Sequence, residues 1–231
     1  MTSDFRYRLV RNTVAVGLTA VLLAGFLMRF PRVDDILGQT ARNLFFHVPM
    51  WFTLMAAMAV SAWHAFKYLR TKDPVRDLRS AEAARVGLFF GLLGITTGMV
   101  WARFTWYEGT GLWWNNDPKQ LMAAVQLLVY AGYFVLRSTL DDPVRRARLS
   151  AAYNLFAATC VPFLLYVLPR QMASLHPGAE GNPAFSQVTH WTMRLVLYPS
   201  FLLFIGLFWV LYTQRVRLVL LQRRLHPEPE L

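Results

Sequence analysis

Six apolar stretches recur along this chain of 231 residues, separated by shorter and more polar segments. They cover approximately residues 13–30, 48–68, 86–102, 121–136, 151–168 and 193–212. Each is close to the roughly 20 residues that a helix needs to cross the hydrocarbon core of a membrane. The sequence shows little sign of repeats or low complexity between them. The pattern predicts an all-α, polytopic membrane protein in which residues 1–231 form a single domain with six transmembrane helices.

The basic residues add an orientation to this picture. Lys and Arg near membrane ends are retained on the cytoplasmic side, and an even number of spans puts both termini on one side. That side carries 17 of the 24 basic residues. We therefore expect both termini to be cytoplasmic and the loops at about 31–47, 103–117 and 169–190 to face outward. The net charge of +11 then indicates membrane topology and not nucleic acid binding.

Two features of the sequence argue against a cleaved signal peptide and against chemistry at cysteine. Basic residues before the first apolar stretch also occur in cleaved signal peptides, but Met28-Arg29-Phe30-Pro31 shows no small-residue cleavage pattern. Cys160, the only cysteine, lies within the fifth span. Because the chain has no C-x-x-C or C-x-x-C-H motif, thiol redox chemistry and covalent haem attachment to this chain are disfavoured.

The second outer loop concentrates tryptophan. Four of the eight tryptophans lie between Trp101 and Asp117, and the loop ends Gly111-Leu112-Trp113-Trp114-Asn115-Asn116-Asp117-Pro118. Asp117 is expected to cap the fourth helix, with Pro118 as its first residue. Gly111 permits a sharp turn before it, so Trp113 and Trp114 should project at the outer interface. They form either an aromatic belt against lipid headgroups or a surface for a flat, partly apolar ligand.

Two of the five histidines are expected on the same side as this loop. His47 opens the second span just before Pro49, which should place its imidazole at the outer surface, and His176 lies in the third outer loop. Two neutral imidazoles can hold a haem iron from both faces, although either ring taken alone is more often an interfacial hydrogen-bonding side chain. His64 is about 25 Å from His47 along one helix and should cap or snorkel near the inner surface. His190 is a reserve candidate.

The combined motifs resemble a known family. His-Val-Pro at 47–49, Trp-Trp-x-x-Asp-Pro-Lys at 113–119, Leu-His-Pro-Gly at 175–178 and the order of six spans are similar to the tryptophan-rich, WWD-type haem-handling family, closest to its CcmC group. The resemblance covers nearly the whole chain. It implies a protein of cytochrome c biogenesis in the bacterial inner membrane, which holds non-covalent, b-type haem at the periplasmic surface and delivers it without acting as an enzyme.

The resemblance also assigns residues. It implies His47 and His176 as axial ligands of the haem iron, and Gly111, Trp113, Trp114, Asp117 and Lys119 as haem-binding residues. Haem needs an aromatic surface and cations for its propionates, so Trp106, Arg103 and Arg194 are added as candidates. Thr110 and Asn116 stand where the family has tryptophan, which removes two of four aromatic faces.

The same resemblance implies partners. Besides haem, these are a CcmE-like periplasmic haem chaperone, CcmA-like and CcmB-like ABC transporter subunits and a small CcmD-like membrane subunit. Membrane lipid surrounds the protein, and no nucleic acid partner is expected.

Three other functions remain alternatives. A transporter or permease subunit would use broken helices, and Pro162 and Pro199 could kink the last two spans, although these spans lack midplane charges. A membrane b-type cytochrome would carry paired histidines inside facing spans. A haem handler of the alternative cytochrome c assembly system would have more spans and extra domains. No nucleophile and base stand at a spacing that predicts an enzyme.

Overall fold

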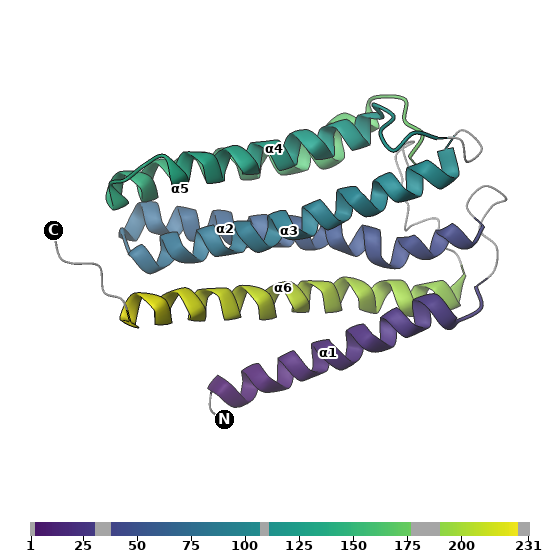
Figure 1. The fold of residues 1–231 in the computed structure, drawn as a ribbon, viewed down its shortest axis with the longest axis horizontal. Helices are drawn as coiled ribbons and strands as arrows, with labels where there is room; N and C mark the ends of the chain where they lie inside the picture. The colour runs from purple at the N-terminus through teal and green to yellow at the C-terminus, as the bar shows by residue number, and fades with distance from the viewer. Residues whose placement is uncertain (1–2, 31–37, 107–110, 177–189, 226–231) are drawn as a thin grey trace.

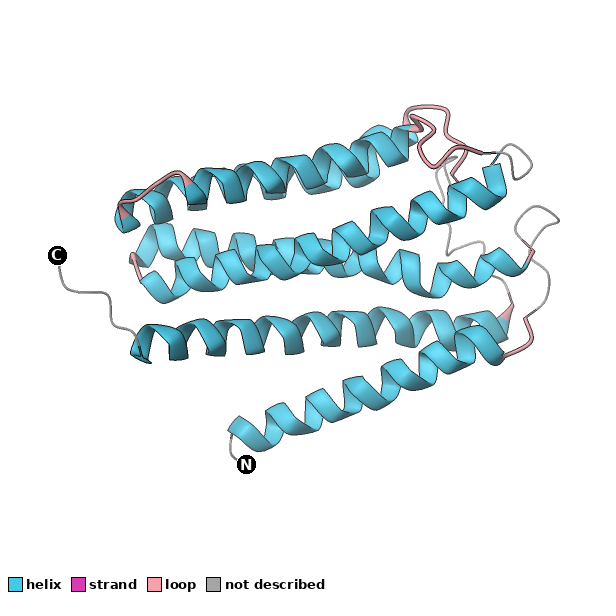
Figure 2. Cartoon of the chain, in the orientation of Figure 1, coloured by secondary structure: helices cyan, strands magenta, loops and turns pink. Residues whose placement is uncertain are grey.

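The computed structural model describes residues 3–30, 38–106, 111–176 and 190–225. These residues form a bundle of long helices and contain no strand (Figure 2). The elements are α1 (Ser3–Leu27), η1 (Gln39–Asn43), α2 (Leu44–Thr71), α3 (Pro74–Thr105), α4 (Pro118–Ser138), α5 (Pro143–Pro162), η3 (Phe163–Val167), η4 (Leu168–Arg170) and α6 (Trp191–Leu225). Six helical segments are long and apolar enough to cross a membrane. The prediction of an all-α chain with six candidate spans is therefore confirmed.

The helices pack in a definite order across the bundle (Figure 1). α2 and α3 pair along their length at the centre, α4 and α5 lie together on one side, and α6 lies on the other with α1 outermost. The start of α1 and the end of α6 are at one end of the bundle. α2, α4 and α6 begin at the opposite end. The described parts of the three loops predicted to share a side of the membrane thus lie at one end, called the loop end below.

Three of the helices begin with the same dipeptide. Asp73, Asp117 and Asp142 each accept a hydrogen bond from a backbone N–H of the first turn, and each precedes a proline. The carboxylate satisfies an orphan N–H, while proline occupies a position where its missing N–H costs nothing. The predicted start of the fourth helix at Asp117-Pro118 is confirmed.

Glycines on α3 allow α2 to approach closely. A Cβ added to Gly94 would lie 2.9 Å from the ring of Trp51, and one added to Gly98 would lie 2.8 Å from Cε1 of His47. Gly91 is similarly covered by side chains, including that of Leu54. Small residues at a helix interface let large side chains of the neighbouring helix lie against the backbone. This interface therefore sets where the ring of His47 lies.

Polar contacts inside the bundle join the helices away from the loop end. Asn154 of α5 donates to the hydroxyls of Ser61 and Ser80 at 2.7 and 2.8 Å, linking α5 to α2 and α3. Arg137 of α4 donates two hydrogen bonds to the carboxylate of Asp77 on α3, at 2.7 and 2.9 Å. Polar groups in a membrane bundle face its interior and pair with one another, as these do.

The two prolines expected to kink the last spans behave differently. After Pro162 the chain continues as the π-turn η3 and the 3₁₀ turn η4, so the regular hydrogen-bond ladder of α5 ends there. Pro199 lies within α6, which remains one continuous helix from Trp191 to Leu225. α6 is therefore not the broken helix on which the transporter alternative depends.

Candidate functional site

Two histidines that are far apart in the sequence meet at the loop end. His47 lies in the second turn of α2, and His176 lies in the segment that follows η4. The centres of their imidazole rings are 6.2 Å apart, with the ring planes inclined by 36°. The structure thus brings together the two residues that the sequence proposes as a pair.

The imidazole of His47 is buried, with only 6% of its surface exposed. Trp51 and Trp101 approach it edge to face, with ring centres at 6.4 and 6.0 Å, and the backbone of Gly98 lies against it. The sequence predicts that this imidazole sits at the outer surface of the membrane, and the structure adds that protein encloses the ring. His47 does lie near the loop end of α2, but Gly98 leaves room for the ring to pack between α2 and α3.

Thr97 determines the tautomer of His47. Nδ1 of His47 lies 3.1 Å from Oγ1 of Thr97, and that hydroxyl donates its single proton to backbone carbonyls of α3, Leu93 among them at 2.9 Å. The Thr97 oxygen therefore accepts from Nδ1–H of His47. In the neutral ring the lone pair is then on Nε2, which is the arrangement that a metal-ligating histidine needs.

Asp117 connects the tryptophan loop to the segment that carries His176. Besides capping α4 through Lys119 N at 2.9 Å, its carboxylate accepts from Ser174 Oγ at 2.9 Å and from Leu175 N at 2.8 Å. The backbone N–H of His176 in turn donates to Ser174 Oγ at 3.1 Å. Asp117 is buried and satisfied by protein donors. It therefore positions His176 as well as starting α4.

Lys119 contacts His176 directly. Its Nζ lies 3.3 Å from Nδ1 of the imidazole. A charged ammonium can only donate, so Nδ1 accepts in this contact and the proton of the neutral ring is on Nε2. The lone pairs of the two histidines are thus arranged differently: that of His47 is on Nε2, and that of His176 faces Lys119. Metal ligation through Nε2 of His176 requires Lys119 to leave Nδ1.

The tryptophan loop is held by its glycine and by Arg103. A Cβ on Gly111 would lie 2.9 and 3.0 Å from the carbonyl oxygens of Ala102 and Trp106, so only glycine fits against this end of α3. Arg103 donates to the carbonyl oxygen of Gly111, and its guanidinium lies 5.9 Å from the centre of the Trp113 ring. Trp113 is 52% exposed and so presents one aromatic face outward, as predicted.

Asn116 has a structural role in the same loop. Its backbone has a φ of 52°, in the left-handed region that asparagine tolerates better than bulky residues. Its side-chain oxygen accepts from the indole N–H of Trp114 at 2.7 Å. Asn115 closes the turn by donating to the carbonyl oxygen of Leu112 at 2.8 Å. The departure from the family pattern at 116 is thus part of the loop's own hydrogen bonding.

Trp106 and Arg194 are the two remaining candidates among the described residues. Trp106 caps the end of α3 and is only 8% exposed, so the expectation that it extends the aromatic surface is wrong. Arg194 lies in the first turn of α6 and is exposed. Thr110, the other departure from the family pattern, lies outside the described residues.

The two other described histidines have partners of their own. His64 is buried, and its Nε2 lies 3.1 Å from the hydroxyl of Tyr212 on α6, so the expectation that it caps or snorkels is wrong. His190 is exposed, and its Nδ1 lies 2.7 Å from Oγ1 of Thr192 at the start of α6.

Sequence reasoning missed Thr97, Gly98 and Ser174. Thr97 and Gly98 lie within an apolar span, where a threonine and a glycine are ordinary helix-packing residues. Ser174 is one of many loop serines and threonines. Their roles depend on contacts between segments far apart in the chain, for which the pattern of one sequence contains no signal.

Comparison with known proteins places the chain in a family. Residues 3–229 match the family described as "CcmC: Heme exporter protein C". The chain is 28% identical over 218 residues to heme exporter protein C of Paracoccus denitrificans (strain Pd 1222), which covers 92% of this chain and 87% of that protein. It is 24% identical over 222 residues to a putative cytochrome c biosynthesis ccmC-like mitochondrial protein of Marchantia polymorpha, covering 94% and 90% respectively.

Another relative matches only part of the chain. Cytochrome c biogenesis protein CcsA of Prochlorococcus marinus (strain MIT 9515) is 35% identical over 80 residues, which is 35% of this chain and 24% of that protein. The family match, by contrast, extends over nearly all of the residues. This chain belongs to the heme exporter protein C family of cytochrome c biogenesis.

Proposed function

We propose that this protein holds haem at the periplasmic surface of the bacterial inner membrane and presents it to a periplasmic haem chaperone. The spacing of His47 and His176 carries the proposal. An imidazole nitrogen binds a metal at about 2 Å, and the ring centre lies roughly 1 Å further out. Two rings on opposite sides of one iron therefore have centres about 6 Å apart. The observed distance of 6.2 Å fits this arrangement.

The surroundings of His47 support a role as the permanent ligand. Thr97 fixes the ring through Nδ1, which leaves the lone pair on Nε2 directed away from that hydrogen bond. The rings of Trp51 and Trp101 and the backbone of Gly98 restrict its movement. A ligand whose orientation is fixed in advance loses little conformational entropy when it binds metal.

The surroundings of His176 support a role as the ligand that changes on loading. Lys119 must leave Nδ1 before Nε2 of His176 can bind iron. A haem propionate is a suitable new partner for this ammonium, because a charged pair replaces a contact with a neutral ring. Binding of the propionate and binding of the iron would then occur together. Loss of one contact would weaken the other, as a delivery protein requires.

Trp113 and Arg103 complete the proposed site. The exposed ring of Trp113 offers an apolar face to the macrocycle. Arg103 lies against that ring and carries a positive charge beside the loop, where it can pair with the second propionate. We propose no contact for Trp106, which is buried, and none for Asp117, whose carboxylate is occupied by protein donors.

The location of the site favours delivery over electron transfer. The pair lies among the loop-end segments and not between the central turns of facing helices, where a b-type cytochrome holds its haem. A ligand at the end of a bundle can leave toward water without crossing the core. We therefore propose a non-enzymatic component that works with a CcmE-like chaperone, CcmA-like and CcmB-like transporter subunits and a CcmD-like membrane subunit.

Absorbance spectroscopy of the protein purified in mild detergent tests haem binding. We expect a Soret band and the spectrum of a six-coordinate, low-spin haem with two imidazole ligands. The combined substitution Trp113→Ala with Trp114→Ala should lower haem occupancy while membrane insertion stays intact. Absence of any haem after reconstitution with hemin would exclude the proposed function.

A transfer assay tests delivery. The haem-loaded protein is mixed with a purified periplasmic haem chaperone of the same assembly system, and the two are separated by affinity chromatography. We expect haem to appear on the chaperone. Haem should appear more slowly on a control acceptor, a periplasmic protein without a haem site. Equal rates with both acceptors would indicate simple dissociation and contradict presentation.

A further inference from the structure

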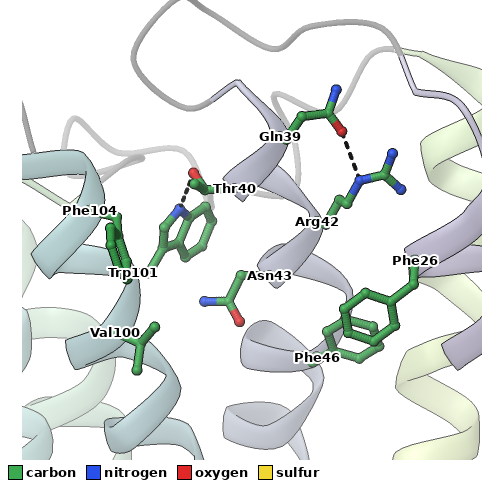
Figure 3. Close-up of a pocket in the computed structure, with 9 residues that line it drawn as sticks. All are labelled: Phe26, Gln39, Thr40, Arg42, Asn43, Phe46, Val100, Trp101 and Phe104. Carbon is green, nitrogen blue, oxygen red and sulfur yellow. Dashed lines mark hydrogen bonds between the residues drawn. The ribbon is translucent and has the colours of Figure 1, made fainter.

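A hollow lies on the outside of the bundle near its loop end (Figure 3). It is a groove of about 290 Å³ between the end of α1, the turn η1 and the loop-end halves of α2 and α3. This groove is called the α1–α3 groove below. None of the residues proposed to contact haem lines it.

The wall of the groove is apolar and already exposed. Phe26 of α1 stacks on Phe46 of α2, with ring centres 5.2 Å apart, and Val100 and Phe104 of α3 form the facing side. Phe26, Val100 and Phe104 are 64%, 46% and 60% exposed. Exposed apolar side chains on a membrane-spanning helix face acyl chains. The groove therefore suits a narrow, flexible hydrocarbon chain.

A cation stands at the rim. Arg42 of η1 donates through Nη1 to the carbonyl oxygen of Gly25 at 2.7 Å. Its Nε donates to the side-chain oxygen of Gln39 at 2.9 Å (Figure 3). Its guanidinium also lies 5.1 Å from the centre of the Phe30 ring. These contacts hold the guanidinium in place with neutral groups. Among the described residues, no carboxylate lies within 4 Å of it, so its charge remains available to an anion.

We propose that the α1–α3 groove binds an anionic phospholipid, with the headgroup phosphate on Arg42 and one acyl chain against Phe46, Val100 and Phe104. An apolar channel with a fixed cation at one end matches a molecule with a hydrocarbon tail and a charged head. The cation lies at the loop end, where the headgroup of a lipid in the adjacent leaflet would be. Charge complementarity and shape thus select the same class of ligand.

The groove is closed toward the histidine pair. The indole of Trp101 lines its inner side and donates to Thr40 Oγ1 at 3.1 Å (Figure 3). The same ring contacts His47, with ring centres 6.0 Å apart. Asn43, also in the lining, donates to the carbonyl oxygen of Thr97 at 3.1 Å. A molecule in the groove is therefore separated from His47 by one ring. This separation, together with the small volume, favours an acyl chain over the broad macrocycle of haem.

Native mass spectrometry of the full chain tests the proposal. The protein is stripped of lipid in detergent and titrated with dioleoyl phosphatidylglycerol, or with dioleoyl phosphatidylcholine as a lipid without net charge. We expect one phosphatidylglycerol to be retained at activation energies that remove phosphatidylcholine. Arg42→Gln should lower the affinity for phosphatidylglycerol by about tenfold, because one charge-assisted contact is lost.

A second variant fills the groove without changing its charge. Val100→Trp should also abolish the tightly held phosphatidylglycerol, and Val100→Phe is a milder version in case the larger ring impairs folding. Arg29→Gln and Leu92→Trp are matched controls. Arg29 is exposed just after the end of α1, Leu92 is exposed on α3, and neither residue lines the groove. Helical circular dichroism and a single elution peak verify that each variant is folded.

Two results would overturn the proposal. Retention of phosphatidylglycerol by Arg42→Gln and Val100→Trp at the level of the controls would mean that only annular lipid is bound. Loss of haem binding in Val100→Trp with unchanged lipid retention would assign the groove to haem. The lipid experiment uses protein without haem, so its outcome does not depend on the function proposed above.

Discussion

The imidazole of His47 is fixed before any ligand is present, whereas that of His176 is engaged by a cation. Thr97 accepts from Nδ1–H of His47, and Lys119 contacts Nδ1 of His176. If both rings bind one iron, they should contribute differently to loading. The buried ring supplies a preformed nitrogen, and the other ring follows once its lysine moves. Single-residue changes can separate these two contributions.

Removing either histidine should leave a five-coordinate haem. For His47→Ala and His176→Ala we expect the low-spin spectrum to become high-spin and haem affinity to fall about tenfold or more, because one coordinate bond is lost. Added imidazole should restore the low-spin spectrum. His190→Ala is the matched control, since His190 is exposed near the start of α6. Unaltered spectra in both variants would contradict the assignment of these two histidines as axial ligands of the haem iron.

Asp117 should act on haem through His176. Asp117→Ala removes the acceptor for Ser174 and Leu175 as well as the cap of α4. It should therefore lower the free energy of unfolding by about 2 kcal/mol more than the loss of a cap alone. Asp142→Ala, which removes a comparable cap from α5, is the control for thermal unfolding in detergent. If Asp117 positions the ligand, imidazole should rescue the spectrum of Asp117→Ala as it does that of His176→Ala. Failure of that rescue would indicate direct contact with haem.

For single residues, the sequence identified the candidate site residues with distinctive chemistry, but it did not identify the residues that position them. His47, His176, Trp113 and Asp117 were all recognisable from residue type and motif. Thr97 was not, because its importance comes from the single ring that packs against it. The burial of His47 was also not predictable, since it depends on the depth to which α2 approaches α3.

Among the elements, α3 determines the position of the candidate site. Its glycines accept large side chains of α2, and Gly98 receives His47. This contact gives a ligand on one helix a position defined by the backbone of another. The packing of α2 against α3 therefore affects how His47 can bind a ligand.

Gly98→Ala should displace the ring of His47. The added Cβ would lie 2.8 Å from Cε1, so the imidazole must shift, at a cost of about 1–3 kcal/mol in packing. We expect weaker haem binding by hemin titration and a partly high-spin spectrum. Gly206→Ala is the control, because its Cβ would meet Val14 at 2.7 Å in the α1–α6 contact, away from His47. Equal loss of haem affinity in both variants would show that the effect is general destabilisation.

The ion pair between α3 and α4 should contribute strongly to stability. Asp77 and Arg137 have side chains only 12% and 15% exposed and are joined by two hydrogen bonds. Asp77→Ala leaves the buried guanidinium of Arg137 unpaired and should lower the free energy of unfolding by about 3 kcal/mol. The double substitution Asp77→Ala with Arg137→Leu should recover part of that loss. Thermal unfolding in detergent measures both.

An exposed ion pair in the same chain provides the comparison. Asp4 and Arg217 are 3.7 Å apart with side chains 74% and 48% exposed, so Asp4→Ala should have little effect. If Asp77→Ala and Asp4→Ala lower the unfolding temperature equally, burial has no special role in the α3–α4 pair.

The six helices were predictable because apolar stretches of membrane length are a strong signal, whereas their ends were not. α3 begins at Pro74, twelve residues before the predicted span at 86, and α6 continues to Leu225, beyond the predicted end at 212. Hydropathy detects the part of a helix that faces lipid, and these helices continue past it. Asp117-Pro118 was placed correctly because a cap and a proline act locally.

For the whole molecule, the two ends of the bundle differ in kind. The loop end carries the histidine pair, the tryptophan loop and the α1–α3 groove. The opposite end carries the start of α1, the end of α6 and most of the basic residues. Charge bias alone predicted that all three long loops share one side. The contacts among their residues depend on folding and could not be predicted in that way.

The orientation itself is the last prediction. Because Lys and Arg resist transfer across the membrane, the end with 17 of the 24 basic residues should remain in the cytoplasm, and the histidine pair should face the periplasm. In a Cys160→Ala background, Leu112→Cys at the loop end should react with a membrane-impermeant maleimide in intact cells. Leu112 is 66% exposed, so its accessibility does not require unfolding. Asp141→Cys, at the opposite end between α4 and α5, should react only after permeabilisation. The reverse pattern would put the histidine pair on the cytoplasmic side, where a periplasmic chaperone could not receive haem from it.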